Sequence, residues 1–302
     1  MHIRILGTAA GGGFPQWNCG CENCNAVRRG TFPGKARSQA QLAVSADGVT
    51  WFLAGASPDL RTQIESFPAL HPGGLRQSPI AGVVLAGADL DHVLGLLLLR
   101  EFQPLRVYST TSVLRILREQ NSMFRMLNRV EKQVEWSPVE PGAAFCLVSA
   151  AGQSSGLSCR MLPLRGRYPK YADAARVAPQ EAVCGLIFES SAGKRAAYVP
   201  AAGDISDELL AAVTGSELLL LDGTFWSDDE PGRVLGGGES ARQMGHVPVQ
   251  DTLRRLRDVN VGRKMFIHIN NTNPMLNEAG PEFRAVHEAG WEIAEDGWRV
   301  DL

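Results

Sequence analysis

The sequence has no long apolar run and no surplus of charge of either sign. Its longest apolar stretch, around Val93 to Leu99, is far shorter than the roughly 20 residues that a transmembrane helix needs. The 30 Lys and Arg residues nearly balance the 32 Asp and Glu residues, so the net charge is -2, and no basic block offers a surface for nucleic acid. No charged segment followed by an apolar run and a cleavage site stands at the N-terminus. We therefore expect a cytoplasmic protein without a membrane span or a nucleic-acid partner.

Repeats, coiled-coil heptads and low-complexity linkers are also missing, so we expect residues 1–302 to form a single domain. Apolar residues make up 44% of the chain and charged residues 21%, which is typical of a globular protein. Strand-like runs alternate with helix-like ones. Asp47-Gly48 lies between two strand-like runs, 41–45 and 50–54, and predicts a hairpin, which excludes an all-parallel sheet. The pattern predicts a layered α/β sandwich.

Acidic residues and a histidine gather where an expected buried strand, 80–85, gives way to a helix. Asp89, Asp91 and His92 offer three possible metal ligands within four positions. A plainer interpretation is also open, in which Asp91 only caps the helix that begins near His92.

Two further candidate ligands follow other predicted strands. His268 ends the strand expected at 264–267, and Asp204 comes after the strand expected at 195–199. Because side chains at strand ends converge on one edge of a sheet, we expect these groups to meet near Asp91 and His92. The segment 225–245 is rich in glycine and charge, and we predict a long surface excursion near this site.

Three of the six cysteines stand within six positions: Cys19, Cys21 and Cys24. In a reducing compartment such a cluster favours a metal over a disulfide, and we expect it to hold a structural zinc. Free thiols are the alternative. The other three cysteines lie in apolar segments, where we predict core thiols: Cys146, Cys159 and Cys184.

Several motifs together resemble one known family. They are Gly11-Gly12-Gly13-Phe14-Pro15-Gln16-Trp17-Asn18-Cys19, Ala56-Ser57-Pro58-Asp59, Asp91-His92, Asp222-Gly223-Thr224, Met244-Gly245-His246 and His268-Ile269-Asn270-Asn271-Thr272-Asn273-Pro274. The set is similar to that of the coenzyme PQQ synthesis protein B (PqqB) family, a branch of the metallo-β-lactamase fold. The resemblance runs from the first strand to the C-terminus. It implies a four-layer αββα sandwich with a metal site on the edge where the two sheets meet.

The resemblance also implies that one of two metal positions has been lost. The superfamily motif His-x-His-x-Asp-His falls on residues 87–92, where Gly87 and Asp89 stand in place of the first two histidines. The histidine expected after the strand near Leu164 is replaced by Arg165. Glycine offers no side-chain ligand and arginine is always cationic, so a second divalent ion would lack donors here.

The other position keeps Asp91, His92 and His268, with Asp204 where the bridging aspartate of the superfamily would sit and Asp89 nearby. Two imidazoles and one carboxylate are the ligands of non-haem Fe(II) oxygenases, and zinc accepts the same set. The cofactor implied is therefore Fe(II) or Zn at this site, beside the structural Zn.

For function, the resemblance implies pyrroloquinoline quinone (PQQ) biosynthesis. We expect metal-dependent oxygenation of a tyrosine-derived precursor, a small molecule that originates in a Glu-Tyr peptide. Transport of PQQ or its precursor toward the periplasm is one alternative, and a metal-dependent hydrolase is another. The sequence leaves the state of assembly open, a homodimer included.

Two residue roles stay open at this stage. Phosphodiesterase relatives complete a similar cysteine trio with a histidine where this chain has Asn271, so the fourth zinc ligand is undetermined, and His268 is a competing candidate for it. His246 occupies the neighbourhood of a histidine that protonates leaving groups in hydrolytic relatives. An acid/base role for His246 and a structural one are both consistent with the sequence.

Overall fold

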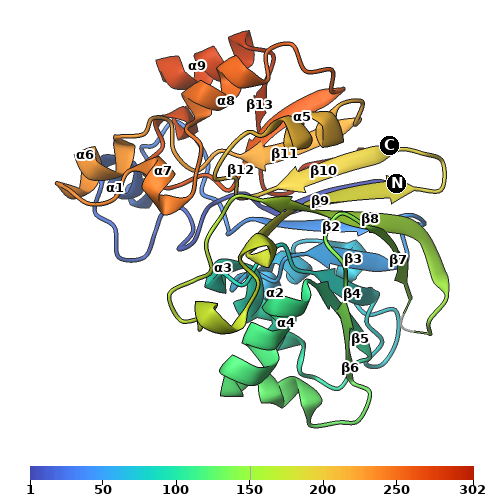
Figure 1. Ribbon diagram of the computed structural model, residues 1–302. Helices are drawn as coiled ribbons and strands as arrows, with labels where there is room; N and C mark the ends of the chain where they lie inside the picture. The colour runs from blue at the N-terminus through green and yellow to red at the C-terminus, as the bar shows by residue number, and fades with distance from the viewer. Residues whose placement is uncertain (150) are drawn as a thin grey trace.

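The computed structural model describes residues 1–149 and 151–302, and two mixed β-sheets form its centre (Figure 1). The first sheet contains β1 (His2–Gly7), β2 (Gln41–Ser45), β3 (Trp51–Ala54), β4 (Ile80–Val84), β5 (Leu105–Ser109), β6 (Val134–Pro138) and β14 (Arg299–Asp301). The second contains β7 (Ala144–Val148), β8 (Ser154–Leu164), β9 (Val183–Ser190), β10 (Arg195–Val199), β11 (Leu218–Asp222), β12 (Arg263–Ile267) and β13 (Glu292–Ile293). Their orders are β14-β1-β2-β3-β4-β5-β6 and β13-β12-β11-β10-β9-β8-β7.

Helices cover the outer face of each sheet (Figure 1). The α-helices are α1 (Glu22–Arg28), α2 (Leu60–Glu65), α3 (Leu90–Val93), α4 (Thr111–Arg115), α5 (Asp207–Val213), α6 (Glu230–Leu235), α7 (Ala241–Met244), α8 (Val249–Arg255) and α9 (Pro281–Glu288). Tighter or wider helical turns occupy Pro68–Leu70, Leu94–Leu99, Ile116–Gln120, Ser122–Asn128, Ala174–Arg176, Pro179–Glu181 and Pro274–Leu276. Helices α2 and α4 lie on the side of the first sheet, whereas α5, α8 and α9 lie on the side of the second.

Strand β11 shows why the layers form. Its Leu218 and Leu220 belong to the core between the sheets, whereas Leu219 and Leu221 belong to the core beneath the outer helices. Successive side chains of a strand point to opposite faces, so a continuous run of leucine buries both faces at once. The αββα sandwich that the resemblance implied is confirmed.

Local predictions were mostly confirmed, with differences near the site. The predicted hairpin is present, because the strands β2 and β3 pair antiparallel around Asp47-Gly48. The helix expected near His92 begins earlier, at Leu90, with Asp89 at its N-cap. Asp91 therefore lies inside the helix, and the interpretation that it caps this helix is wrong.

Two other expectations need correction. The segment 225–245 is not only a surface excursion, because it contains α6 and α7. Cys159 and Cys184 are buried as predicted, but Cys146 is exposed, because it lies on β7, which ends the second sheet. Within the part of the chain that the structure describes, no helix is long and apolar enough to cross a membrane.

Candidate metal centre

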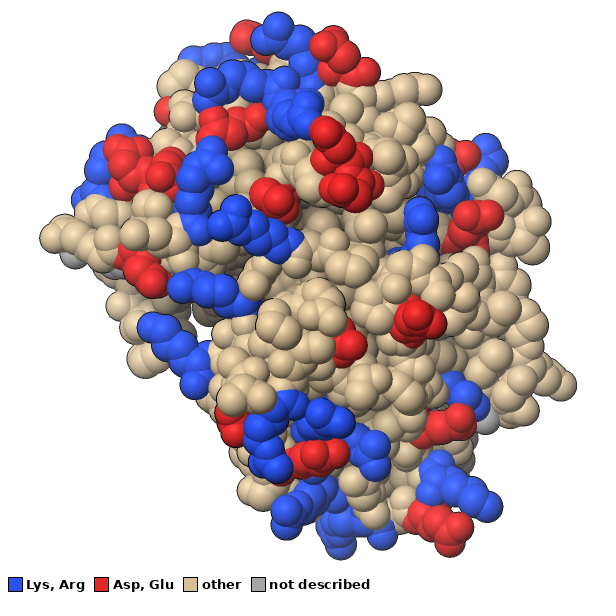
Figure 2. All heavy atoms as spheres, in the orientation of Figure 1, with Lys and Arg blue, Asp and Glu red and all other residues tan. Residues whose placement is uncertain are grey.

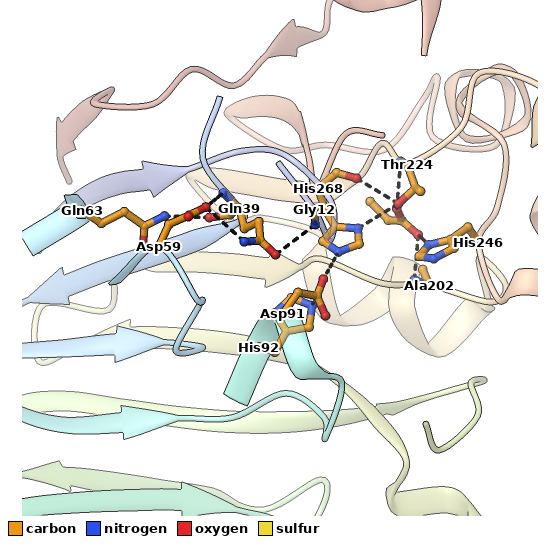
Figure 3. A network of polar contacts seen from close by, with 11 residues as sticks. Gly12, Gln39, Asp59, Gln63, Asp91, His92, Ala202, Thr224, His246 and His268 are labelled. Carbon is orange, nitrogen blue, oxygen red and sulfur yellow. Dashed lines mark hydrogen bonds and ion pairs between the residues drawn. The ribbon is translucent and has the colours of Figure 1, made fainter. Parts of the chain in front are cut away.

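Five polar side chains from both sheets meet at one edge of the sandwich (Figure 3). Asp91 and His92 lie on α3, which follows β4 of the first sheet. Asp222 ends β11 and His268 directly follows β12, two parallel neighbours in the second sheet. His246 follows α7. The carboxyl ends of parallel strands share one edge, which is why residues so distant in sequence converge here.

Asp91, His92 and His268 can hold one metal ion. A ligand atom of each lies within 4.8 Å of those of the other two. Nε2 of His268 is 3.0 Å from Oδ2 of Asp91, and Nε2 of His92 is 3.8 Å from the same oxygen. The two rings stack at 23°, with their centroids 5.3 Å apart. The imidazoles thus face a common point beside a carboxylate.

Asp222 and His246 stand beside this group and share His268 with it. Nδ1 of His246 is 2.7 Å from Oδ2 of Asp222, and the rings of His246 and His268 stack at 22°, with centroids 5.7 Å apart. Ligand atoms of these three residues also lie within 4.8 Å of one another. The arrangement can orient His246 for proton transfer or bring it against a metal ion.

Backbone geometry around His268 is unusual, because His268 has φ 58°, in the left-handed region that favours glycine. Thr224 holds this conformation. Its Oγ1 lies 2.9 Å from Nδ1 of His268 and 2.9 Å from the carbonyl oxygen of His268. The same hydroxyl is 2.6 Å from Oδ1 of Asp222. The Asp222-Gly223-Thr224 turn therefore fixes the ring of His268 with its Nε2 toward Asp91.

The glycine-rich loop after β1 closes another side of the site. A Cβ atom on Gly11 would lie 3.4 Å from Oδ2 of Asp91. The amide of Gly12 donates to Oε1 of Gln39 at 3.1 Å, and Gln39 in turn donates to Oδ2 of Asp59 through its backbone and side-chain nitrogens (Figure 3). The two motifs that begin at Gly11 and Ala56 thus brace the loop that borders the carboxylate.

Burial and mutual charge shift the pKa values of these groups. Burial acts to raise the pKa of Asp91, but the charges of His92 and His268 outweigh it and hold that pKa below its usual range. Burial, with the charge of Asp91 added, raises the pKa of Asp89. For His268, the neighbouring Asp91 carboxylate overcomes burial and raises the pKa. Such coupled shifts in a cluster of ligand-type residues are typical of a functional site.

The structure places Asp222, and not Asp204, beside the histidines. Asp204 lines a separate cavity of about 460 Å³ together with Arg242, Arg254 and Arg255, so its expected bridging position is corrected. Asp222 is 2% exposed and also accepts a hydrogen bond from the amide of Ala202 at 3.0 Å. Its signal was present in the sequence, because Asp222 directly follows the apolar run 218–221 just as His268 follows a predicted strand.

Asp89 lies near the group without belonging to it. Gly87 and Arg165 bring no ligand atom to the cluster within the described residues. Gly87 instead forms a bridge with Val183 at the start of β9. The ligand atoms that lie within 4.8 Å of one another at this edge belong to Asp91, His92 and His268 and to the adjoining Asp222 and His246.

The cysteine trio forms a second candidate metal site. The sulfur atoms of Cys19, Cys21 and Cys24 lie within 4.8 Å of one another. Nδ2 of Asn271 lies 3.2, 3.5 and 3.3 Å from them in that order, whereas His268 faces Asp91. The oxygen and nitrogen of an amide are distinguished only by their hydrogen bonds, so a flipped Asn271 would present Oδ1 to the sulfurs. Three thiolates and one oxygen match the tetrahedral preference of zinc.

Comparison with known proteins points to the same family as the sequence motifs. Residues 50–269 match the beta-lactamase superfamily domain. The coenzyme PQQ synthesis protein B of Gluconacetobacter diazotrophicus is 40% identical over 99% of this chain and 99% of that one. The chain belongs to the coenzyme PQQ synthesis protein B family. The likeness spans both candidate sites, as the motifs had predicted.

Solved structures agree with this assignment. The crystal structure of Zn²⁺-bound PqqB from Methylobacterium extorquens is 38% identical and covers 100% of both chains, with a TM-score of 0.92. A diphosphatase from the PhnP family covers 100% of this chain and 97% of its own at 19% identity, with a TM-score of 0.69. The second likeness shows the shared fold alone. Together they establish the metallo-β-lactamase fold for this PqqB family member.

Proposed function

We propose that the chain acts in PQQ biosynthesis by hydroxylating the aromatic ring of a small precursor built from Glu and Tyr. Its membership of the PqqB family supports the pathway. The observation that carries the reaction type is the donor set Asp91, His92 and His268, whose ligand atoms converge from two sheets. Two histidines and one carboxylate with open positions suit Fe(II) in oxygenases.

The donors present fit a bound metal ion. The half-buried carboxylate of Asp91 and the two buried imidazoles lie close together without a Lys or Arg partner within the described residues. A bound cation would balance the charge of this carboxylate. When bound, Fe(II) would supply the redox chemistry that activates O₂. A second ion of the hydrolytic kind is disfavoured, because Gly87 and Arg165 stand where two of its ligands would be.

The chain's own residues then have distinct tasks. Asp222 accepts a hydrogen bond from Nδ1 of His246 and fixes the orientation of that ring. His246 can move a proton to or from the phenol oxygen of the substrate through Nε2. Thr224 keeps the ring of His268 aligned with Asp91.

The overall hydroxylation balances with an external reductant. One oxygen atom of O₂ is inserted into an aromatic C–H bond and gives C–OH. The other leaves as water after taking two protons and two electrons from a small organic reductant of the ascorbate class. The chain needs no redox-active side chain of its own for this stoichiometry.

We further propose that Cys19, Cys21 and Cys24 hold a structural zinc with Asn271 as the fourth ligand through Oδ1. The backbone amides of Gln16, Cys21 and Cys24 lie 3.4, 3.4 and 3.5 Å from cysteine sulfurs. Amides directed at sulfur favour the thiolate form that zinc requires.

The test is anaerobic loading with Fe(II), followed by addition of O₂, ascorbate and a diamino acid in which Glu and Tyr are joined. We expect oxygen uptake and a mass gain of one oxygen atom in the product. Zinc-loaded protein is the matched control and should do neither. Rapid hydrolysis of phosphodiesters or lactams without oxygen uptake would favour a hydrolase. Tight binding of PQQ with no turnover would favour the carrier alternative.

A further inference from the structure

A cleft of about 320 Å³ opens between the segment after β8 and helix α7. It is lined by Arg165, Gly166, Arg167, Gly203, Arg242, Gln243 and Gly245. Three arginines line it, and no Asp or Glu is among the lining residues that the structure describes. Figure 2 shows Lys and Arg atoms beside a hollow in the left part of this face, in the region of α7. The cleft is therefore suited to an anion.

The three arginines differ in their partners. Arg167 lies 3.8 Å from Glu239 and donates to the carbonyl of Gln243. Arg242 forms an ion pair with Asp251. For Arg165, the described residues supply no ion pair and no side-chain hydrogen bond. An exposed guanidinium without a partner keeps its planar set of donors available for a carboxylate, which it can bind through two parallel hydrogen bonds.

Backbone contacts join this cleft to the metal centre. The amide of Gly203 donates to the carbonyl of Arg165 at 3.0 Å, and a Cβ atom on Gly203 would lie 2.4 Å from that oxygen. Gly203 follows Ala202, whose amide donates to Asp222 at 3.0 Å. Gly245, another lining residue, directly precedes His246. Gly203 and Gly245 thus belong to the segments that hold the Asp222–His246 pair.

We propose that this cleft is the carboxylate-binding subsite of the substrate pocket, with Arg165 as its specificity-determining residue. The inference rests on the proposed function, because a precursor built from Glu and Tyr is an amino acid with several carboxylates. Arg165 binds one of them while the aromatic ring extends toward Asp91, His92 and His268. Arg167 and Arg242, held by their acidic partners, form the rim and strengthen the positive potential.

Arg165 occupies a position at which the superfamily has a metal ligand. In the resemblance drawn from the sequence, a metal-binding histidine would stand where this chain has Arg165. One substitution therefore removes a metal ligand and adds a carboxylate receptor at the same edge.

The experiment compares wild type with Arg165→Gln, Arg165→Lys and the control Arg129→Gln, which removes an exposed arginine elsewhere. In the Fe(II) assay, we expect Arg165→Gln to raise KM by about tenfold or more while kcat changes little. Arg165→Lys keeps the charge but loses the paired hydrogen bonds, so its KM should fall between those of wild type and Arg165→Gln. Arg129→Gln should match wild type.

A binding arm separates this inference from the proposed reaction. The probes are PQQ, which carries carboxylates, and the methyl ester in which every carboxyl group of PQQ is esterified. Each probe is titrated by calorimetry into each of the four proteins. We expect PQQ to bind wild type more tightly than its ester does, and Arg165→Gln to lose that preference. If wild type hydroxylates the precursor but Arg165→Gln keeps its KM and its preference for PQQ, the subsite is wrong and the reaction stands. If wild type shows no hydroxylation, the reaction falls, and the binding arm alone decides the subsite.

Discussion

Nδ1 of His246 lies 2.7 Å from Oδ2 of Asp222, a carboxylate that is 2% exposed. Both oxygens of this carboxylate are already engaged, Oδ2 also by the amide of Ala202 and Oδ1 by the amide and hydroxyl of Thr224. Asp222 therefore cannot rotate without losing several hydrogen bonds. The ring of His246 is fixed through one nitrogen, and its other nitrogen is left for a metal or a substrate.

We expect Asp222→Asn to lower kcat or Fe(II) affinity about 10- to 100-fold, as removal of partners that orient ligands commonly does. The amide cannot accept at both positions where the carboxylate does, so His246 loses its fixed orientation. The measurement is oxygen uptake at several Fe(II) concentrations. Asp204→Asn is the control and should stay within about twofold of wild type. Equal losses in both variants would contradict the geometry.

Removing one ligand imidazole tests the metal centre directly. His92→Ala should abolish metal-dependent turnover and lower the bound Fe(II) content, because one of three ligands disappears. Circular dichroism should still report a folded chain. The control is His287→Ala, which alters an exposed histidine on α9 and should retain its iron. Full iron content and activity in the His92→Ala protein would show that His92 is not a ligand of this metal centre.

For the cysteine site we predict that Cys21→Ser lowers the midpoint of thermal unfolding and the zinc content together. The free energy of metal binding contributes to folding, and hydroxyl oxygen is a poorer zinc ligand than thiolate. Zinc is measured by elemental analysis of the same samples that are melted. Cys146→Ser changes an exposed cysteine outside the trio and should alter neither quantity. Unchanged stability with one zinc fewer would argue against a structural role.

A buried carboxyl on α6 predicts a pH dependence of stability. Burial raises the pKa of Glu230 to about 7, although hydrogen bonds from Thr272 and the amide of Trp226 oppose that shift. The folded chain thus keeps this proton to near pH 7, whereas the unfolded chain releases it near pH 4.5. Between those values the folded state binds more protons, so the contribution of Glu230 to the free energy of unfolding falls as pH rises.

Glu230→Gln should remove this part of the pH dependence. Its amide can accept from Trp226 and donate to Thr272, so it replaces the protonated form and keeps its contacts. The free energy of unfolding is measured in urea at pH 5 and at pH 7.5. Between these pH values, that of wild type should fall by about 2 kcal/mol more than that of Glu230→Gln. Glu288→Gln, on the exposed part of α9, is the control and should follow wild type. Parallel curves for Glu230→Gln and wild type would refute the assignment.

Strand and hairpin patterns predicted the sandwich well, because buried strands such as β11 carry their signal in every residue. The same patterns predicted that Asp91, His92 and His268 would share an edge. They predicted Asp204 beside these residues and did not consider Asp222, because both stand near strand ends and only the path of the chain decides which carboxylate turns inward. The amide of Ala202 donates a hydrogen bond to Asp222. A contact between such distant segments produces no periodic pattern in the sequence, so it could not be predicted.

Asn271 illustrates another limit. Its spacing from His268 marked the position of a possible fourth ligand, but an amide is an uncommon zinc donor, so composition could not assign it. The folded chain brings its side chain to within 3.2 to 3.5 Å of the three sulfur atoms, and this proximity supports the proposed role. The arginine cleft had no sequence signature either, because Arg165, Gly203 and Gly245 come from three separate segments.

The left-handed backbone of His268 (φ 58°) means that stability and chemistry compete for one position. A residue with a Cβ atom pays roughly 1 kcal/mol or more for this conformation, and glycine would not. Only an imidazole, however, can reach Asp91 from here while its second nitrogen is anchored by Thr224. The hydrogen bonds of Thr224 therefore keep the segment after β12 in a strained backbone conformation. Engineering this protein for heat resistance by relaxing that turn would remove the ligand on which the site depends.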